Sequence, residues 1–174
     1  ASHFLGHAYY QWNRLEEAAN TLKRGIDLCA QLGYIMDQIV GQSTLAQTKM
    51  GQSEWAAAKD ACDNAHELSQ KMKGYIYAQR WAEDCQIRFW VAKCAEEKNY
   101  LLKASRWAEQ SGMQIDDELN FLHELAHIML ARVLVAQGQA DPDGEYLADA
   151  HYLLERLLET AESAGWMGKA IEIL

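Results

Sequence analysis

Apolar residues recur along most of the chain at intervals of three and four positions, the spacing that places them on one face of an α-helix. Glycines interrupt this pattern, and a glycine just past a helix end can take the positive φ that other residues avoid. The six glycines expected to end helices are Gly33, Gly51, Gly74, Gly112, Gly138 and Gly165. We therefore predict helices over residues 3–12, 14–32, 34–50, 53–73, 75–95, 97–111, 116–137, 145–164 and 166–174. Connections this short make neighbouring helices antiparallel.

Small residues recur at a fixed spacing within these predicted hairpins. The pairs Gly6 to Ala18, Ala46 to Ala58 and Ala92 to Ala104 are each 12 residues apart. The fourth pair, Ala131 to Ala150, is 19 apart, which indicates seven inserted residues around Pro142. Small side chains let two helices cross closely, so the spacing predicts four related hairpins. A plain helical bundle with chance alanines is the alternative.

The first hairpin carries most of the tetratricopeptide signature. Leu5, Gly6 and Tyr9 are followed by Ala18 and Leu22 at the required spacing. We expect an all-α, tetratricopeptide-like, right-handed superhelix of about four antiparallel helix hairpins, with residues 1–174 as a single domain. Solenoids need polar terminal caps, and neither end of this sequence looks capped. The sequence is therefore interpreted as a fragment of a longer solenoid that can self-associate through its apolar ends.

Charge and composition narrow the classes of function. The chain has 16 basic and 25 acidic residues, a formal charge of −9, with no basic stripe, so this segment is not expected to contact DNA. Its apolar runs are too short for a membrane span, and it has no signal peptide, which favours the cytoplasm. The cysteines Cys29, Cys62, Cys85 and Cys94 form no C-x-x-C pair and are interpreted as reduced, structural thiols.

Three separated blocks resemble the tetratricopeptide sensor region of MalT-like regulators, a subgroup of the large LuxR-type bacterial transcription regulators. The blocks are RWAEQSG at 106–112, DDEL at 116–119 leading to LARVLVAQG at 130–138, and LLERLLE at 153–159 ending in IEIL at 171–174. The resemblance implies a non-catalytic domain without a cofactor, whose repeats sense an inducer or hold the regulator inactive. It also implies an ATPase module before the repeats and a helix-turn-helix after them, neither of which this sequence contains.

One sequence motif points to a different chemistry. Residues 123–127 read H-E-x-x-H, which on a helix places two imidazoles on one face for zinc and a glutamate beside them as general base. Glu155 would lie opposite His127 if the last hairpin folds at residues 138–144, which offers a third ligand. His127, however, occupies the tryptophan position of the repeat, which faces the hairpin interior. We therefore interpret His123 and His127 as structural, and a zinc hydrolase is the remote alternative.

A ligand site is expected on the first helices of the hairpins, which line the concave surface of a solenoid. In each first helix, helical spacing from the small crossing residue identifies the positions expected to be exposed. The candidate ligand-binding residues are His7, Tyr10, Ser43, Gln47, Phe89, Lys93 and Arg132. Gln47, Phe89, Lys93 and Arg132 are expected to converge on one ligand. This mixture suits a small-molecule inducer such as a sugar, or a peptide or protein segment, including other domains of the same regulator. A solvated face with its partner elsewhere, and a protein scaffold of another signalling protein, are the alternatives.

Overall fold

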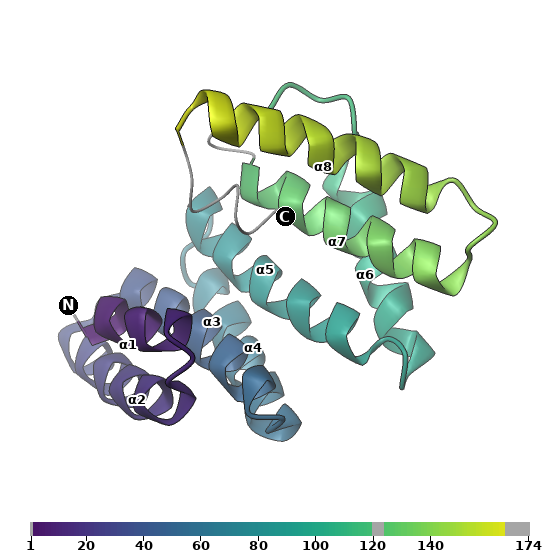
Figure 1. Cartoon of the computed structure of the whole chain (residues 1–174). Helices are drawn as coiled ribbons and strands as arrows, with labels where there is room; N and C mark the ends of the chain where they lie inside the picture. The colour runs from purple at the N-terminus through teal and green to yellow at the C-terminus, as the bar shows by residue number, and fades with distance from the viewer. Residues whose placement is uncertain (1, 120–123, 166–174) are drawn as a thin grey trace. The chain divides into compact units, whose positions relative to one another are not determined.

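The computed structural model describes residues 2–119 and 124–165, excluding the side chains of residues 2 and 3, and within these ranges its regular secondary structure is all helix, without a strand (Figure 1). Its helices are α1 (Ser2–Gln11), α2 (Leu15–Leu32), α3 (Ile35–Gly51), α4 (Trp55–Gln70), α5 (Ile76–Lys93), α6 (Lys98–Ser111), α7 (Glu124–Ala140) and α8 (Tyr146–Ser163). The all-α prediction is confirmed over these ranges. The helix predicted over 166–174 lies outside them. None of the helices described is long and apolar enough to cross a membrane.

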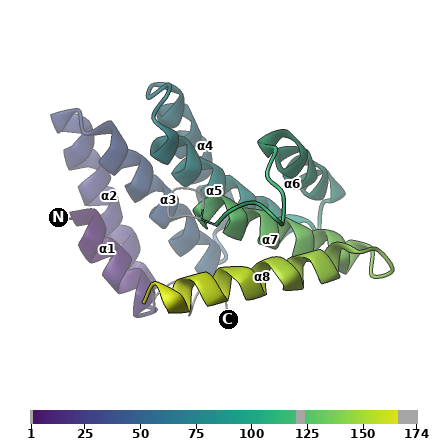
Figure 2. The ribbon, with the colours of Figure 1, turned by 90° about the horizontal axis from the view of Figure 1, so that it is seen from above.

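The helices form two compact units, residues 1–89 and 90–174, and α5 runs from the first unit into the second. In the first unit α1 packs against α2 and α3, α2 packs against α3, and α3 packs against α4. In the second unit α7 packs against α6 and α8, and Figure 2 shows α7 and α8 alongside each other. The expectation that residues 1–174 act as a single domain stays a prediction.

The small residues that define the repeat lie mostly where the sequence places them, at helix crossings. Buried crossing residues are Gly6, Ala18, Ala46, Ala58, Ala104, Ala131 and Ala150. A Cβ added to Gly6 would lie only 2.5 Å from Cγ of Leu22. The close approach of α1 and α2 therefore requires glycine at this position. The expectation is wrong at Ala92, which is exposed in the last turn of α5.

Four of the six predicted helix-ending glycines take the expected backbone conformation. Positive φ values of 68–84° occur at Gly33, Gly74, Gly112 and Gly165. The prediction is wrong at Gly51, because the positive φ after α3 is taken by Ser53. It is also wrong at Gly138, which is buried inside α7. A Cβ there would lie 2.4 Å from Cγ of Leu147, so close packing against α8 explains this glycine.

The chain after α6 departs most from the predicted elements. A helix was expected from residue 116, but residues 113–119 form turns, and the helix described next begins at Glu124. Arg156 of α8 donates a hydrogen bond from Nη1 to the carbonyl of Ile115 and another from Nη2 to the carbonyl of Asp117, 2.9 Å away. The Asp117 carboxylate accepts the Gln114 N–H at 2.9 Å. These side chains satisfy backbone groups that a helix would have paired.

One apolar cluster from each unit shows how its helices pack. A cluster in the first unit consists of Ile39 and three alanines, Ala65, Ala78 and Ala82. The cluster in the second unit is built mainly from large aliphatic side chains of α7 and α8, namely Ile128, Leu130, Leu134, Leu153 and Leu157. Side chains of the turn segment 113–119 cover part of this second cluster.

Candidate functional site

The predicted ligand stripe begins on α1 with two residues that stay accessible. His7 is exposed, and its Nε2 lies 3.3 Å from Nε2 of Gln11. The ring of Tyr10 is half-buried, with its centroid 6.2 Å from that of His7. These residues therefore present an imidazole and a phenol together on one turn of the helix.

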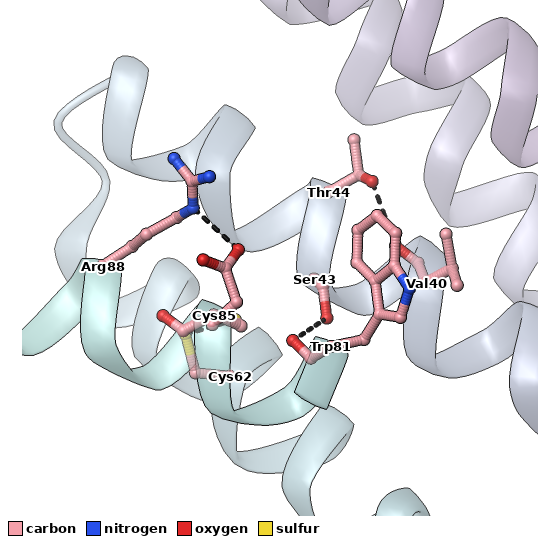
Figure 3. Close-up of polar contacts among 8 residues, drawn as sticks. Val40, Ser43, Thr44, Cys62, Trp81, Cys85 and Arg88 are labelled. Atoms are coloured by element: carbon pink, nitrogen blue, oxygen red, sulfur yellow. Dashed lines mark hydrogen bonds and ion pairs between the residues drawn. The ribbon is translucent and has the colours of Figure 1, made fainter. Parts of the chain in front are cut away.

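Two stripe residues of the first unit are interior, contrary to the expectation of exposure. Ser43 is fully buried, because α5 packs over it and its hydroxyl donates to the Trp81 carbonyl at 3.2 Å (Figure 3). Phe89 is only 4% exposed and meets the Trp55 ring edge-on, with centroids 6.3 Å apart. Gln47, on α3, is half-buried. Ser43 and Phe89 thus hold helices together in this structure.

The remaining stripe residues belong to the second unit. Lys93 forms an ion pair with Glu96, and its side chain is 12% exposed. Arg132 is half-buried on α7. Because Gln47 and Phe89 lie in the first unit, the convergence of these four residues on one ligand stays a prediction.

An open groove lies on α1 and α2, outside the predicted stripe. It has a volume of about 630 Å³, within the range of roughly 300–1,000 Å³ typical of small-ligand sites. Its lining residues are Leu5, Tyr9, Thr21, Arg24, Asp27, Leu28 and Gln31. The groove therefore combines two leucines and a phenol with a hydroxyl, an amide and one charge of each sign.

Helical periodicity explains which side chains reach the groove. On α2, Thr21, Arg24, Leu28 and Gln31 are three or four residues apart and share one face. The opposite face, with Ala18 and Leu22, is buried. Leu28 and Leu5 are each about half exposed, so their apolar surface is open to a ligand.

The rim of the groove is ordered by a basic side chain at the α1–α2 turn. The Arg14 guanidinium lies 4.7 Å from the centroid of the Tyr9 ring, a cation–π distance. Arg14 also donates from Nε to the Glu17 carboxylate at 2.8 Å. This hydrogen bond lowers the pKa of Glu17 and raises that of Arg14.

Sequence reasoning missed this groove because it considered only the first helix of each hairpin. The sequence nevertheless held one signal for the groove. Leu28 is an apolar residue of α2 that does not share the face of the buried positions 18, 19, 22, 25 and 26. A single exposed leucine is common on protein surfaces, so this signal could not locate the groove without the neighbouring residues of α1.

The H-E-x-x-H motif lies at the start of α7, and its first histidine, His123, is outside the described residues. His127 is fully buried, with Nε2 3.8 Å from a carboxylate oxygen of Asp117, which confirms its assignment to the hairpin interior. Glu124 is also buried. Glu155 does not lie opposite His127 as expected, because it is on the exposed face of α8, 3.5 Å from Nδ1 of His151. Within residues 2–119 and 124–165, no group of three His, Cys, Asp or Glu side chains is arranged to hold a metal.

Comparison with known proteins points to one family. The profile of the MalT-like TPR region matches residues 1–174, the whole length of the chain. No curated protein and no solved structure matches. The match agrees with the buried small residues at the helix crossings and with the helical repeat architecture of the described ranges.

Proposed function

The chain belongs to the MalT-like TPR family, and from this premise we propose that it is the effector-sensing or protein-interaction domain of a LuxR-type, MalT-like transcription regulator. The domain acts by binding and not by catalysis. It works in the cytoplasm, makes no DNA contact itself, and passes its bound state to the other domains of the regulator. The bound partner is a small-molecule inducer such as a sugar, or a peptide or protein segment.

The observation that carries this proposal is the groove on α1 and α2. Leu5 and Leu28 offer apolar contact, and Tyr9 offers an aromatic face with a polar tip. Thr21 and Gln31 can both donate and accept hydrogen bonds, which suits the hydroxyls of a sugar or the amides of a peptide. Five of the seven lining residues carry a hydroxyl, amide or charged group, a composition that suits a hydrogen-bonding ligand such as a sugar or a peptide.

The accessible stripe residues are the second proposed set of contacts: His7, Tyr10 and Gln47 in the first unit, and Lys93 and Arg132 in the second. His7 and Tyr10 lie on α1, the helix that also supplies Leu5 and Tyr9 to the groove. A peptide or protein segment is long enough to touch both surfaces of this helix, whereas a monosaccharide fits the groove alone. The size of the bound partner therefore distinguishes the two arrangements.

Self-association is part of the same proposal. Phe4, Leu5, Leu28, Leu32 and Tyr34 are exposed on or beside α1 and α2, with Phe4 72% exposed. Such a concentration of exposed apolar side chains is typical of a surface that meets another protein. Helical repeats stack on their neighbours through faces of this kind.

A ligand screen by thermal shift tests the proposal. Sugars, peptides and nucleotides are added to the purified chain, and a ligand at 100 times its Kd stabilises it by about 2.7 kcal/mol, a shift of several degrees in Tm. We expect a hit whose effect is largely lost in Leu28→Asp and Arg24→Ala. Leu102→Asp on α6 is the matched control, because Leu102 is also an exposed leucine on a second helix of a hairpin.

The outcomes separate the candidate surfaces. A shift that persists in the groove variants but disappears in Gln47→Ala and Arg132→Ala moves the site to the stripe. Binding of a peptide without any small-molecule hit favours the scaffold alternative. Equal loss in Leu102→Asp, or no ligand of any class, contradicts the proposal.

A further inference from the structure

Two buried cysteines face each other across α4 and α5. The sulfur of Cys62 lies 2.7 Å from the sulfur of Cys85 and 3.3 Å from the Cys85 carbonyl. Both residues belong to the first unit, and Figure 3 draws them side by side. Their exposed fractions are 2% and 0%. A disulfide has a sulfur–sulfur distance of about 2.05 Å, so bonding requires an approach of less than about 1 Å.

Other contacts hold α5 beside α4 and α3: the Phe89 ring of α5 meets the Trp55 ring of α4 edge-on, with centroids 6.3 Å apart. One turn before Cys85, the Trp81 carbonyl accepts the Ser43 hydroxyl, which ties α5 to α3. One turn after it, Arg88 donates to the Asp84 carboxylate at 2.7 Å along the same helix (Figure 3). The close approach of the sulfurs is therefore part of an ordered packing arrangement, in which neither helix must be rebuilt to join them.

We propose that Cys62 and Cys85 are a modification site that forms a reversible intramolecular disulfide when the protein meets a peroxide. This inference stands independently of which ligand the domain binds. It also goes beyond the interpretation of the cysteines as inert core residues. Two thiols at this distance can form a disulfide with each other, which a single buried thiol cannot do.

The chemistry balances with one molecule of hydrogen peroxide. The sulfur of one cysteine, as a thiolate, attacks the O–O bond and becomes a sulfenic acid, and the departing hydroxide takes up the thiol proton as water. The second sulfur then attacks the sulfenic sulfur, the S–S bond forms, and the sulfenic oxygen leaves with the second thiol proton as another water. Two thiols and one peroxide thus give one disulfide and two waters.

Burial determines when this reaction occurs. Desolvation is the main cause that raises the pKa of Cys85, and the neighbouring thiol and the Asp84 carboxylate act in the same direction. The thiol is therefore protonated and slow to react near neutral pH, and the protein packing excludes bulky reagents. A small oxidant that enters during local opening meets both sulfurs together, so a sulfenic acid is captured before further oxidation.

The disulfide would join the second hairpin to the helix that follows it. Residues 62 and 85 are 23 positions apart, and the loop between them includes the turn after α4. Closing such a loop removes conformations from the unfolded chain. We expect oxidation to raise the Tm by about 5 °C or more, given the usual stabilisation by a loop of this size.

Peptide mapping of the wild-type chain tests the inference. The purified protein is treated with hydrogen peroxide, remaining thiols are blocked with an alkylating reagent, and the digest is examined by mass spectrometry. We expect a linked Cys62–Cys85 peptide, a protein mass lower by two hydrogens, and a raised Tm, all reversed by dithiothreitol. The double variant Cys29→Ala, Cys94→Ala should behave in the same way, and Cys62→Ala should lose all three effects.

Three results would overturn the inference. These are alkylation of both Cys62 and Cys85 after peroxide treatment, their conversion to sulfinic or sulfonic acid, or linkage of either one to Cys29, Cys94 or a second chain. The map of the wild-type protein decides among them, so the test does not depend on the folding of the Cys62→Ala variant.

Discussion

The two units of this chain share small residues at their helix crossings and differ in what covers the packed helices. In the first unit, alanines and Gly6 lie at the crossings, helices approach closely, and short turns connect them. In the second unit, leucines of α7 and α8 build the core, and the non-helical segment 113–119 covers part of it. Ala131, Ala150 and Gly138 make the crossing close in the second unit as well, so the added segment, and not the size of the crossing residues, distinguishes the two units.

This difference changes what each unit depends on. Each unit depends on the absence of side-chain atoms at one close approach, Gly6 to Leu22 in the first and Gly138 to Leu147 in the second, so adding a methyl group should damage either one. The second unit also depends on one long side chain, Arg156, which holds the backbone of the irregular segment. The following predictions test that comparison, starting with the largest expected effect.

Removing the Arg156 guanidinium should destabilise the second unit. Arg156→Met keeps the apolar stem but leaves the Ile115 and Asp117 carbonyls without their charged donor. Hydrogen bonds from charged groups contribute about 1.5–3 kcal/mol each, and partial exposure reduces the total. We expect the free energy of unfolding, measured in urea, to fall by about 2–3 kcal/mol, with faster amide exchange over residues 113–119.

The matched control for this change is Arg106→Met on the exposed face of α6. It removes the same group from a solvated position and should cost less than about 0.5 kcal/mol. Equal destabilisation by the two variants would show that Arg156 has no special role in holding the irregular segment.

A methyl group added at one close-packed glycine of each unit should affect the two units unequally. In Gly6→Ala the new Cβ lies 2.5 Å from Cγ of Leu22, which is fully buried and cannot move aside. In Gly138→Ala it lies 2.4 Å from Cγ of Leu147, which is 44% exposed and can rotate away. We expect losses of about 2 kcal/mol and about 1 kcal/mol or less, because the gain in helix propensity offsets part of each clash.

Chemical denaturation of both alanine variants checks this order. Gly112→Ala is an unsuitable control because its positive φ adds backbone strain, whereas Ala92→Ser changes a side chain at an exposed repeat position. Ala92→Ser should leave the free energy of unfolding almost unchanged. A larger loss for Gly138→Ala than for Gly6→Ala would contradict the proposed difference between the units.

The smallest expected effect is a dependence of the stability of the first unit on alkaline pH. The pKa of Cys85 is raised well above its ordinary value of 9.0 in the folded chain, chiefly by burial. Its contribution is therefore fully present below pH 9.0, where the thiol is protonated in both states. As the pH rises above 9.0 the unfolded thiol ionises first, so the free energy of unfolding should fall.

Denaturation of the reduced protein between pH 8 and pH 10 measures this dependence. The slope should be smaller in Cys85→Ala, and unchanged in Ala92→Ser, which alters no titratable group. An identical slope in the wild type and Cys85→Ala would assign the alkaline loss to other groups.

Much of the architecture was predictable from local pattern. Three features of the sequence identified most helices and the crossings. These are the apolar residues three and four positions apart, the glycines at 33, 74 and 112, and the 12-residue spacing of small residues. Each feature depends on residues close together in the chain, because a helix buries one apolar face whichever element packs against it. Family membership followed from the same repeated positions together with the blocks around residues 106–112 and 130–138.

The sequence alone determined the helical content, the hairpin register and the family, because each depends on residues close together in the chain. Only the tertiary structure decided which first-helix residues are interior and which apolar ones stay open. Ser43 and Phe89 fit the exposed spacing but are covered by α5 and Trp55, and Leu28 forms a groove with α1. The segment 113–119 is likewise non-helical where a helix is expected, and Arg156, some 40 residues away, donates hydrogen bonds to its backbone. Contacts between distant segments override local preference in two ways. They pair backbone groups that a helix would have paired, or they cover a side chain that its position in the helix would leave exposed.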